Sequence, residues 1–166
     1  MQIQRGTIDI TGTNGTGTAT VTAVNVDCSE LFLIGYNSGE ATNIVNVMGH
    51  LILTNSTTVT ATRDTANLGG GVTATLGFEL REWMPGIIKR VQRGTIVLTG
   101  VSTNTATITE VDTAKSILRM NGNLANANAP DRSQVRLTLT NGTTITATRS
   151  SSTNDTTVAY EITEFY

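Results

Sequence analysis

Residues 53–63 read LTNSTTVTATR, and residues 139–149 read LTNGTTITATR, so the second stretch repeats the first with two changes. In each, apolar or small residues alternate with threonine, which is typical of a strand with one buried and one solvent-facing side. Asn141-Gly142 predicts a tight hairpin of type I′, because that turn needs positive φ at both central residues. Asn55-Ser56 fits this pattern less well and predicts a looser turn.

Two further matches occur in the same order. QRGTI at residues 4–8 returns at 92–96, and ATVT at 19–22 returns as ATIT at 106–109. Matches that keep their order while the intervening loops change length indicate two tandem copies of one folding unit. Below, repeat 1 is residues 1–84 and repeat 2 is residues 91–166. We expect each repeat to be one β-sandwich domain, with 85–90 as a linker too short for independent movement.

The composition favours an all-β protein. About one residue in five is threonine, which is β-branched and suits the polar side of a strand, whereas aromatic residues make up only 4%. Units of roughly 80 residues have small cores, so we expect the repeats to pack on each other or on other chains. The fold class that follows is two tandem antiparallel β-sandwiches, or small barrels, related by internal duplication.

Five or six strands are expected in each repeat because alternation at period two recurs between Gly, Asn and Thr turns. No stretch has convincing helical periodicity. The expected strands are 3–12, 18–26, 30–36, 47–54, 57–63 and 72–83 in repeat 1, then 91–100, 105–112, 116–121, 134–140, 143–149 and 157–165 in repeat 2.

Charge and composition exclude several partners. Charged residues make up 14% of the chain, the net charge is −2 and no basic run occurs, so a nucleic-acid partner is not expected. No apolar run approaches the roughly 20 residues that cross a bilayer, and no signal peptide is recognisable, so we expect no membrane partner and synthesis in a host cytoplasm. Weak charge gives weak self-repulsion, which favours association.

Residues that could carry catalysis are few, and we expect no enzyme and no cofactor or metal. His50 is the sole histidine and Cys28 the sole cysteine, too few for the usual zinc or copper sites. We interpret His50 as a surface histidine at a strand start. Glu79 and Glu82 recur as Glu161 and Glu164, but residues three apart on a strand point to opposite faces. We expect one of each pair to form an ion pair with Arg63 or Arg5, or with their counterparts Arg149 and Arg93.

The chain resembles repeats in small accessory or decoration proteins of tailed-bacteriophage virions. The resemblance lies in QRGTI, ATIT followed by a Val-Asp-Thr run, the LTN…TATR hairpin and a final strand with VAYEITEF, and it covers nearly all of residues 91–166 and, more weakly, 3–83. It implies a β-sandwich that assembles in many copies on a capsid or tail. The strand order is also loosely similar to the H-type lectin fold, in which an aromatic residue near the last strand helps to hold sugar.

We therefore expect a non-enzymatic virion protein, and first of all a capsid decoration (cement) protein that binds the assembled shell and stabilises it. Its partners would be the major capsid protein or another virion protein, and further copies of itself, with a trimer favoured. The alternative is a glycan-binding or receptor-binding module of a tail or fibre. The candidate contacts lie in the two loops that differ most between repeats and at the aromatic strand ends: Tyr36, Asn37, Glu40, Asn43, Asn123, Asn126, Asp131, Arg132, Trp83, Phe165 and Tyr166.

Overall fold

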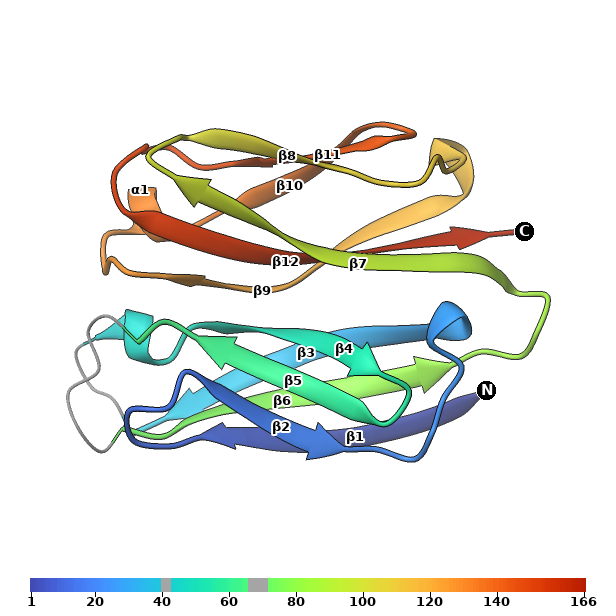
Figure 1. Ribbon diagram of the computed structural model, residues 1–166, viewed down its shortest axis with the longest axis horizontal. Coiled ribbons are helices and arrows are strands. Elements are labelled where there is room, and N and C mark those ends of the chain that lie inside the picture. The colour runs from blue at the N-terminus through green and yellow to red at the C-terminus, as the bar shows by residue number, and fades with distance from the viewer. Residues whose placement is uncertain (40–42, 66–71) are drawn as a thin grey trace.

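The computed structural model describes residues 1–39, 43–65 and 72–166. It is all-β, with short helical turns at a few loops (Figure 1). Each expected strand is present, although the first strand of repeat 2 begins at Ile88, inside the expected linker 85–90, and its third strand continues to Ala125, beyond the expected end at residue 121. Repeat 1 holds β1 (Gln2–Ile10), β2 (Thr16–Thr20), β3 (Ser29–Ser38), β4 (Gly49–Asn55), β5 (Thr58–Arg63) and β6 (Ala74–Glu82). Repeat 2 holds β7 (Ile88–Thr99), β8 (Thr103–Thr107), β9 (Ser116–Ala125), β10 (Arg136–Asn141), β11 (Thr144–Thr148) and β12 (Asp155–Phe165).

The strands pair in the same antiparallel pattern in both repeats. Repeat 1 has one sheet ordered β1-β6-β3 and a second ordered β2-β5-β4. Repeat 2 copies them as β7-β12-β9 and β10-β11-β8. The two sheets of a repeat face each other and do not close into a barrel, so each repeat is a sandwich.

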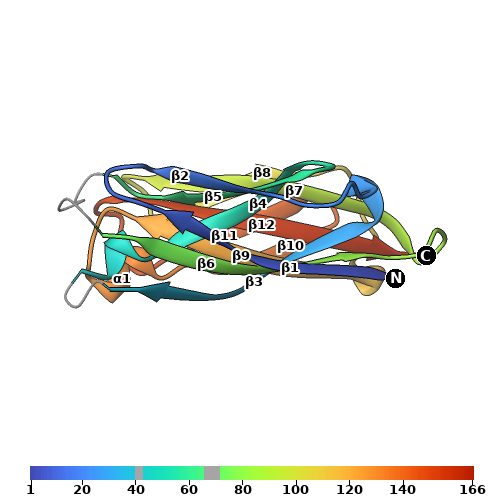
Figure 2. The ribbon, with the colours of Figure 1, turned by 90° about the horizontal axis from the view of Figure 1, so that it is seen from below.

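The two repeats share one sheet. β4 of repeat 1 pairs with β9 of repeat 2 at His50 and Gly122, which joins the strands in the order β2-β5-β4-β9-β12-β7. The repeats are stacked in Figure 1, with the sheet β9-β12-β7 lying against the β3–β4 side of repeat 1. Both termini lie at one end of an elongated molecule, and helix α1 (Pro130–Ser133) lies at the other (Figures 1 and 2).

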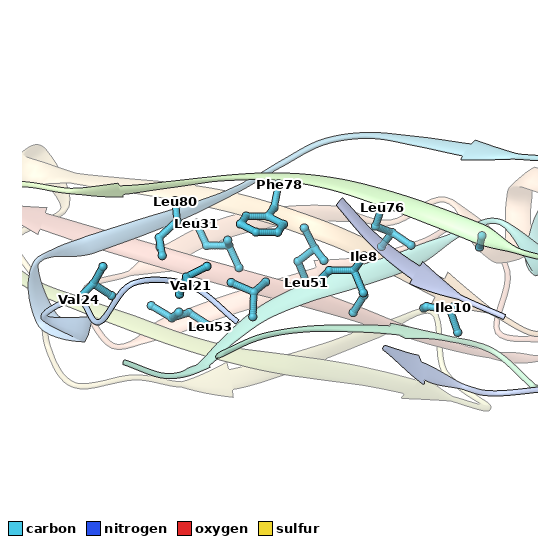
Figure 3. Packing of buried hydrophobic residues seen from close by; sticks show 13 residues of the cluster. Ile8, Ile10, Val21, Val24, Leu31, Leu51, Leu53, Leu76, Phe78 and Leu80 are labelled. Atoms are coloured by element: carbon cyan, nitrogen blue, oxygen red, sulfur yellow. The ribbon is translucent and has the colours of Figure 1, made fainter. Parts of the chain in front are cut away.

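The inward residues of the two sheets fill a separate core in each repeat. In repeat 1, alternate residues of β1, β4, β5 and β6 meet side chains from the β2–β3 connection (Figure 3). The core of repeat 2 is built from the corresponding residues, with Tyr160 where repeat 1 has Phe78. Fully burying one such aliphatic or aromatic side chain contributes about 1.5–3 kcal/mol, so the alternation seen in the sequence accounts for the sandwich.

The hairpin turns correct two expectations. The predicted type I′ turn is wrong, because neither Asn141 nor Gly142 has positive φ. Instead the Asn141 side-chain oxygen accepts from the Thr143 N–H at 2.9 Å and from its hydroxyl at 3.0 Å, an Asx turn. Asn55 makes the same two contacts with Thr57, at 2.9 and 3.1 Å. The first turn is therefore stabilised by the same two hydrogen bonds as the second, and the expected looser turn is not seen.

Strands β2 and β8 are shorter than expected. After β2 the chain leaves the ladder, and Val21 and Val24 turn into the core while their N–H groups donate to loop carbonyls. A 3₁₀ turn then follows in each repeat, η1 (Val26–Cys28) and η3 (Thr113–Lys115). Asn25 caps the first and Asp112 the second, each accepting from the N–H two residues on. Apolar residues at period two therefore continue here beyond the strand itself.

Candidate interaction site

The seam between the repeats is built around a buried carboxylate, Glu161, in the middle of β12. Arg93 from β7 approaches its Oε2 at 2.7 Å, and Arg119 from β9 approaches its Oε1 at 2.8 Å. The backbone N–H of Leu31, from β3 of repeat 1, also donates to Oε1 at 3.0 Å. A buried charge is tolerated when ion pairs and hydrogen bonds replace its water, and here both repeats supply them.

Repeat 1 meets this face with an edge formed by η1 and the start of β3. The Arg93 guanidinium donates to the carbonyl oxygens of Val26, at 3.0 Å, and Ser29. Arg119 also forms an ion pair with Glu30, whose Oε1 accepts from the Thr163 hydroxyl at 3.0 Å. The seam therefore combines an arginine-rich sheet face of repeat 2 with backbone and carboxylate acceptors on the edge of repeat 1.

Two aromatic residues of repeat 1 complete this part of the seam. The Phe32 ring has the Arg119 guanidinium 3.9 Å from its centroid and that of Arg81 at 4.3 Å, both favourable cation–π distances. The Trp83 indole N–H donates to the Glu30 Oε2 at 2.8 Å. Trp83, a candidate contact, is thus half-buried and helps to hold the seam.

At the other end of the seam the backbones of the two repeats come close together. Gly122 has a φ of 92°, and a Cβ there would overlap the Gly49 carbonyl and lie 2.9 Å from both the Leu33 side chain and the Tyr36 hydroxyl. A glycine is therefore required. The Tyr36 hydroxyl donates to the Gly49 carbonyl at 2.9 Å, so this candidate contact is partly engaged inside the chain.

His50 lies beside this close approach, and the expectation of a surface histidine is wrong. Its side chain is buried where β4 pairs with β9, and its Nδ1 has no hydrogen-bond partner among the described residues. Burial lowers the pKa of His50 to about 4, since the charged imidazolium would lose its water there. The cause was invisible in the sequence, because it is the other repeat that covers His50.

The corresponding sheet face of repeat 1, formed by β1, β6 and β3, is open. Strand register makes Arg5 and Glu79 the counterparts of Arg93 and Glu161, and they also pair, at 2.5 Å. Arg81 approaches Glu79 from the other side at 2.5 Å and, with Arg5, holds the pKa of Glu79 below its usual range. This confirms the expected pairing of the recurring glutamate with Arg5 and with Arg93.

A shallow hollow of about 280 Å³ lies further along this open face. Ile34, Tyr36 and Asn37 of β3 line one side of it, and Thr7 and Thr75 the other. Asn37 is exposed, and Ile34 is among the most exposed large apolar residues of the protein. The hollow offers apolar and hydroxyl surface and suits a protein partner better than a charged ligand.

The candidate residues of the second loop fall into two groups. Asn123 is buried, and its side-chain nitrogen donates to the Ser133 carbonyl at 2.6 Å. Asn126 accepts from the Asp155 N–H at 2.9 Å. Asp131 is exposed, and Arg132 bonds the Asn154 side chain at 3.1 Å. Asn123 and Asn126 therefore shape the loop, whereas Asp131 lies on its surface.

The two diverged loops meet at one end of the molecule. The N–H of Val45, in the 3₁₀ turn η2 (Ile44–Asn46), points at the Asn128 side-chain oxygen at 3.4 Å. We call residues 43–48 together with 126–133 the loop tip; it lies at the α1 end, opposite the termini (Figure 1). Asn43 precedes η2, and its side-chain oxygen has no hydrogen-bond partner among the described residues. Glu40 lies outside the described residues.

The remaining aromatic candidates lie at the opposite end, beside the termini. Phe165 is half-buried at the end of β12, and Tyr166 is exposed, with its N–H 3.4 Å from the Ile87 carbonyl. The sequence placed these residues and Trp83 in one aromatic group. The structure separates their roles, because Trp83 is tied to Glu30 in the seam.

Two arginines that were expected to form ion pairs instead bind backbone carbonyls. Arg149 is buried and donates to a cluster of carbonyl oxygens that includes those of Leu98 at 2.9 Å and Asn154 at 2.6 Å. Arg63 binds the Gly12 carbonyl at 2.6 Å and others in the same way. Each closes the loop end of one sandwich. The recurrence of both at the end of the TATR motif was the available signal.

The described residues contain no group of three or more His, Cys, Asp or Glu side chains placed to hold a metal ion. Nor does the described part of the chain contain a helix long and apolar enough to cross a membrane. The recurring glutamates are engaged: Glu164 contacts Lys89 at 2.8 Å and Arg90 at 3.1 Å, and Glu82 accepts from the Asn25 N–H at 2.7 Å.

No protein-family model and no curated protein matches the sequence. Among solved structures, the chain is similar to one in the atomic structure of Sulfolobus Turreted Icosahedral Virus, with 17% identity and a TM-score of 0.27. The match covers 97% of this chain and 59% of that one, so this chain spans less than two thirds of its length. A TM-score this low carries no argument about fold or function.

Proposed function

We propose that the protein is a non-enzymatic structural protein of a bacteriophage virion that decorates the capsid shell. The observation that carries the proposal is the loop tip. Two repeats of the same fold bring together, at one end, the two loops in which they differ most, and the loops touch through Val45 and Asn128. Function on a rigid β scaffold concentrates in such loops. A tip made from two different loops suits one defined site on a protein lattice.

The rest of the molecule supports this role. The carboxylates that recur between repeats are held by arginine, lysine or backbone N–H groups, so they serve the fold. The shared sheet and the buried seam fix the tip relative to both cores. The tip displays Ile44, an exposed apolar side chain, and the exposed Asp131. A contact that combines burial of Ile44 with polar pairing at its rim is typical of protein–protein interfaces.

Cryo-electron microscopy of virions purified from a host that produces the protein during infection tests the proposal. We expect density for the two stacked sandwiches on the outside of the capsid, with the loop tip toward the shell. Density confined to the tail or fibre would overturn the capsid assignment and direct the search to the glycan-binding alternative. Particles without this density would overturn the virion role altogether.

A binding measurement on shells stripped of the protein tests the tip itself. Ile44→Asp places a charge in the proposed contact and should reduce occupancy of the shell at least about tenfold, since an unpaired buried charge costs more than 1.4 kcal/mol. Thr138→Asp, on an exposed position of β10 away from the tip, is the matched control and should bind as the unmodified protein does. Equal binding by both variants would exclude the tip as the contact.

A further inference from the structure

The seam uses one face of repeat 2, the β9 edge at Gly122, and one edge of repeat 1 that includes Phe32. Outside the seam lie the rest of the β1-β6-β3 face of repeat 1, and η3 with the start of β9 in repeat 2. We propose that these two surfaces bind each other between molecules, so that a second molecule docks its repeat 2 edge on the repeat 1 face head to tail. The inference stands on the seam geometry and does not depend on the capsid role.

The face of repeat 1 keeps the groups that bind an edge in the seam. Arg5 holds Glu79 as Arg93 holds Glu161, but the Arg93 side chain is 12% exposed and that of Arg5 is 62% exposed. In the seam the guanidinium of Arg93 reaches the Val26 and Ser29 carbonyls. On the open face, Arg5 therefore presents the same fork of donors toward solvent.

The edge of repeat 2 keeps the matching acceptors. The backbone angles of the residue before the 3₁₀ turn are −77° and 110° at Asn25 and −73° and 112° at Asp112. Those after it are −117° and 137° at Ser29 and −120° and 141° at Ser116. The Thr113 and Ser116 carbonyls consequently point away from repeat 2 as the Val26 and Ser29 carbonyls point away from repeat 1. Strand register makes Leu118 the counterpart of Leu31. The Leu118 N–H therefore points off the edge of β9, as the Leu31 N–H points off the edge of β3.

Where the face of repeat 1 differs from the face of repeat 2, the edge of repeat 2 differs from the edge of repeat 1 in a complementary way. In the seam, Arg119 on the face pairs with Glu30 on the edge. Register makes Phe32 the counterpart of Arg119 and Ile117 the counterpart of Glu30. The ion pair of the seam thus has two apolar counterparts. Arg119 already covers part of the Phe32 ring, so Ile117 would dock on the remaining part of this face, and it brings no unpaired charge. Ile117 is 52% exposed where Glu30 is 3% exposed, so about half of its surface is left uncovered in the single chain.

Further along both surfaces lie exposed apolar side chains whose counterparts in the other repeat are packed in the seam. Ile34 on the open face is 60% exposed, whereas its counterpart Asn121 is 2% exposed. On the edge, Met120 is exposed, and its counterpart Leu33 packs against Gly122 in the seam. A head-to-tail contact would cover both Ile34 and Met120. Such contacts build closed rings when the rotation closes and filaments when it does not.

Crosslinking between two single-cysteine proteins tests the pairing. Cys28 is first replaced by serine, and Ile34→Cys and Met120→Cys are made in separate chains; both positions are exposed, so folding should be retained. A short bis-maleimide should link the two proteins when they are mixed and give little dimer with either alone. Dimer from Ile34→Cys alone would indicate a face-to-face contact and overturn the proposal. So would a mixture that gives no link at concentrations where light scattering detects association.

The edge can be tested without crosslinking by light scattering on the purified chain. Ile117→Lys should raise the concentration for half-association at least about tenfold, because docking would bring its ammonium group against the Arg81 guanidinium of the open face. Val101→Lys, at an exposed valine in the β7–β8 loop, is the control and should associate as the parent does. Equal association by both variants, or a monomer at all concentrations, would overturn the proposal. Free protein is used, so failure here is distinct from failure to bind a capsid.

Discussion

His50 is a titratable residue that the fold encloses at the point where β4 meets β9. Its burial depends on both repeats, since Gly122 and its neighbours on β9 cover a strand of repeat 1. A neutral imidazole is the form that this site accepts, and the pKa of His50 is lowered from 6.5 to about 4. The residue therefore links the stability of the joined repeats to pH.

We expect the stability that depends on His50 to fall as pH decreases from about 6.5 to about 4. Within this range the unfolded chain binds the proton and the folded chain does not, so acid favours unfolding; below it both forms are protonated and the loss is complete. The loss should reach at most about 3 kcal/mol. Urea unfolding at several pH values should show a steeper decline for the parent than for His50→Leu. Parallel curves would contradict the low pKa.

Arg149 closes one end of the sandwich of repeat 2 with a single guanidinium group. Arg149→Met keeps much of the side-chain volume but leaves several buried carbonyls, including those of Leu98 and Asn154, without a donor. We expect a loss of roughly 3–5 kcal/mol in the free energy of unfolding, since each unsatisfied buried group costs about 1–3 kcal/mol. Arg136→Met, at an exposed position of β10, should change stability little. Similar losses of stability in both variants would show that the carbonyl contacts of Arg149 matter less than the length and charge of an arginine side chain.

At the scale of elements, the hairpins β4–β5 and β10–β11 depend on the same asparagine despite their different turn sequences. Asn55 and Asn141 each accept two hydrogen bonds from the threonine two residues on. The type I′ expectation failed because it considered only the backbone preference of Asn-Gly and not what the asparagine side chain could bind. Ser56 is accommodated because a turn without positive φ does not require glycine.

We expect Asn55→Ala and Asn141→Ala to cost the same, about 1–2 kcal/mol each, because each removes one acceptor that serves two donors. Chemical denaturation of the two variants measures this directly. Ser56→Ala, at the exposed centre of the first turn, is the control and should be close to neutral. A much smaller loss for Asn55→Ala than for Asn141→Ala would support the looser first turn that the sequence suggested.

At the scale of the whole molecule, the sequence predicted what each repeat does alone and missed what the repeats do together. Period-two alternation and the matched motifs indicated all the strands and the duplicated sandwich, because burial within one repeat determines those patterns. The boundaries of β2 and β8 were wrong, since Val24 and Val111 enter the core without being in a strand.

The seam was not predictable, because its chemistry depends on residues distant in sequence. Glu161 and Glu79 are identical in type and paired alike with Arg93 and Arg5, so no local pattern distinguishes the buried network from its open counterpart. Of the candidate contacts, the sequence indicated the two diverged loops as a prediction, and the structure adds that these loops meet. The burial of Asn123 and the anchoring of Trp83 required the fold, since Ser133 and Glu30 supply their partners.

The difference between these two glutamates measures how strongly the repeats are joined. Glu161→Gln keeps the shape of the side chain but leaves Arg93 and Arg119 without their shared carboxylate at a buried site, which should lower the free energy of unfolding by about 3–5 kcal/mol. Glu79→Gln removes the same group on the open face, where Arg5 remains hydrated, so its loss should be much smaller. Urea unfolding of both variants tests this, and equal losses would show that the seam network adds nothing beyond the pair present in each repeat. A larger loss for Glu161→Gln than for Glu79→Gln would show that the ion pair of each repeat gains strength when the other repeat encloses it.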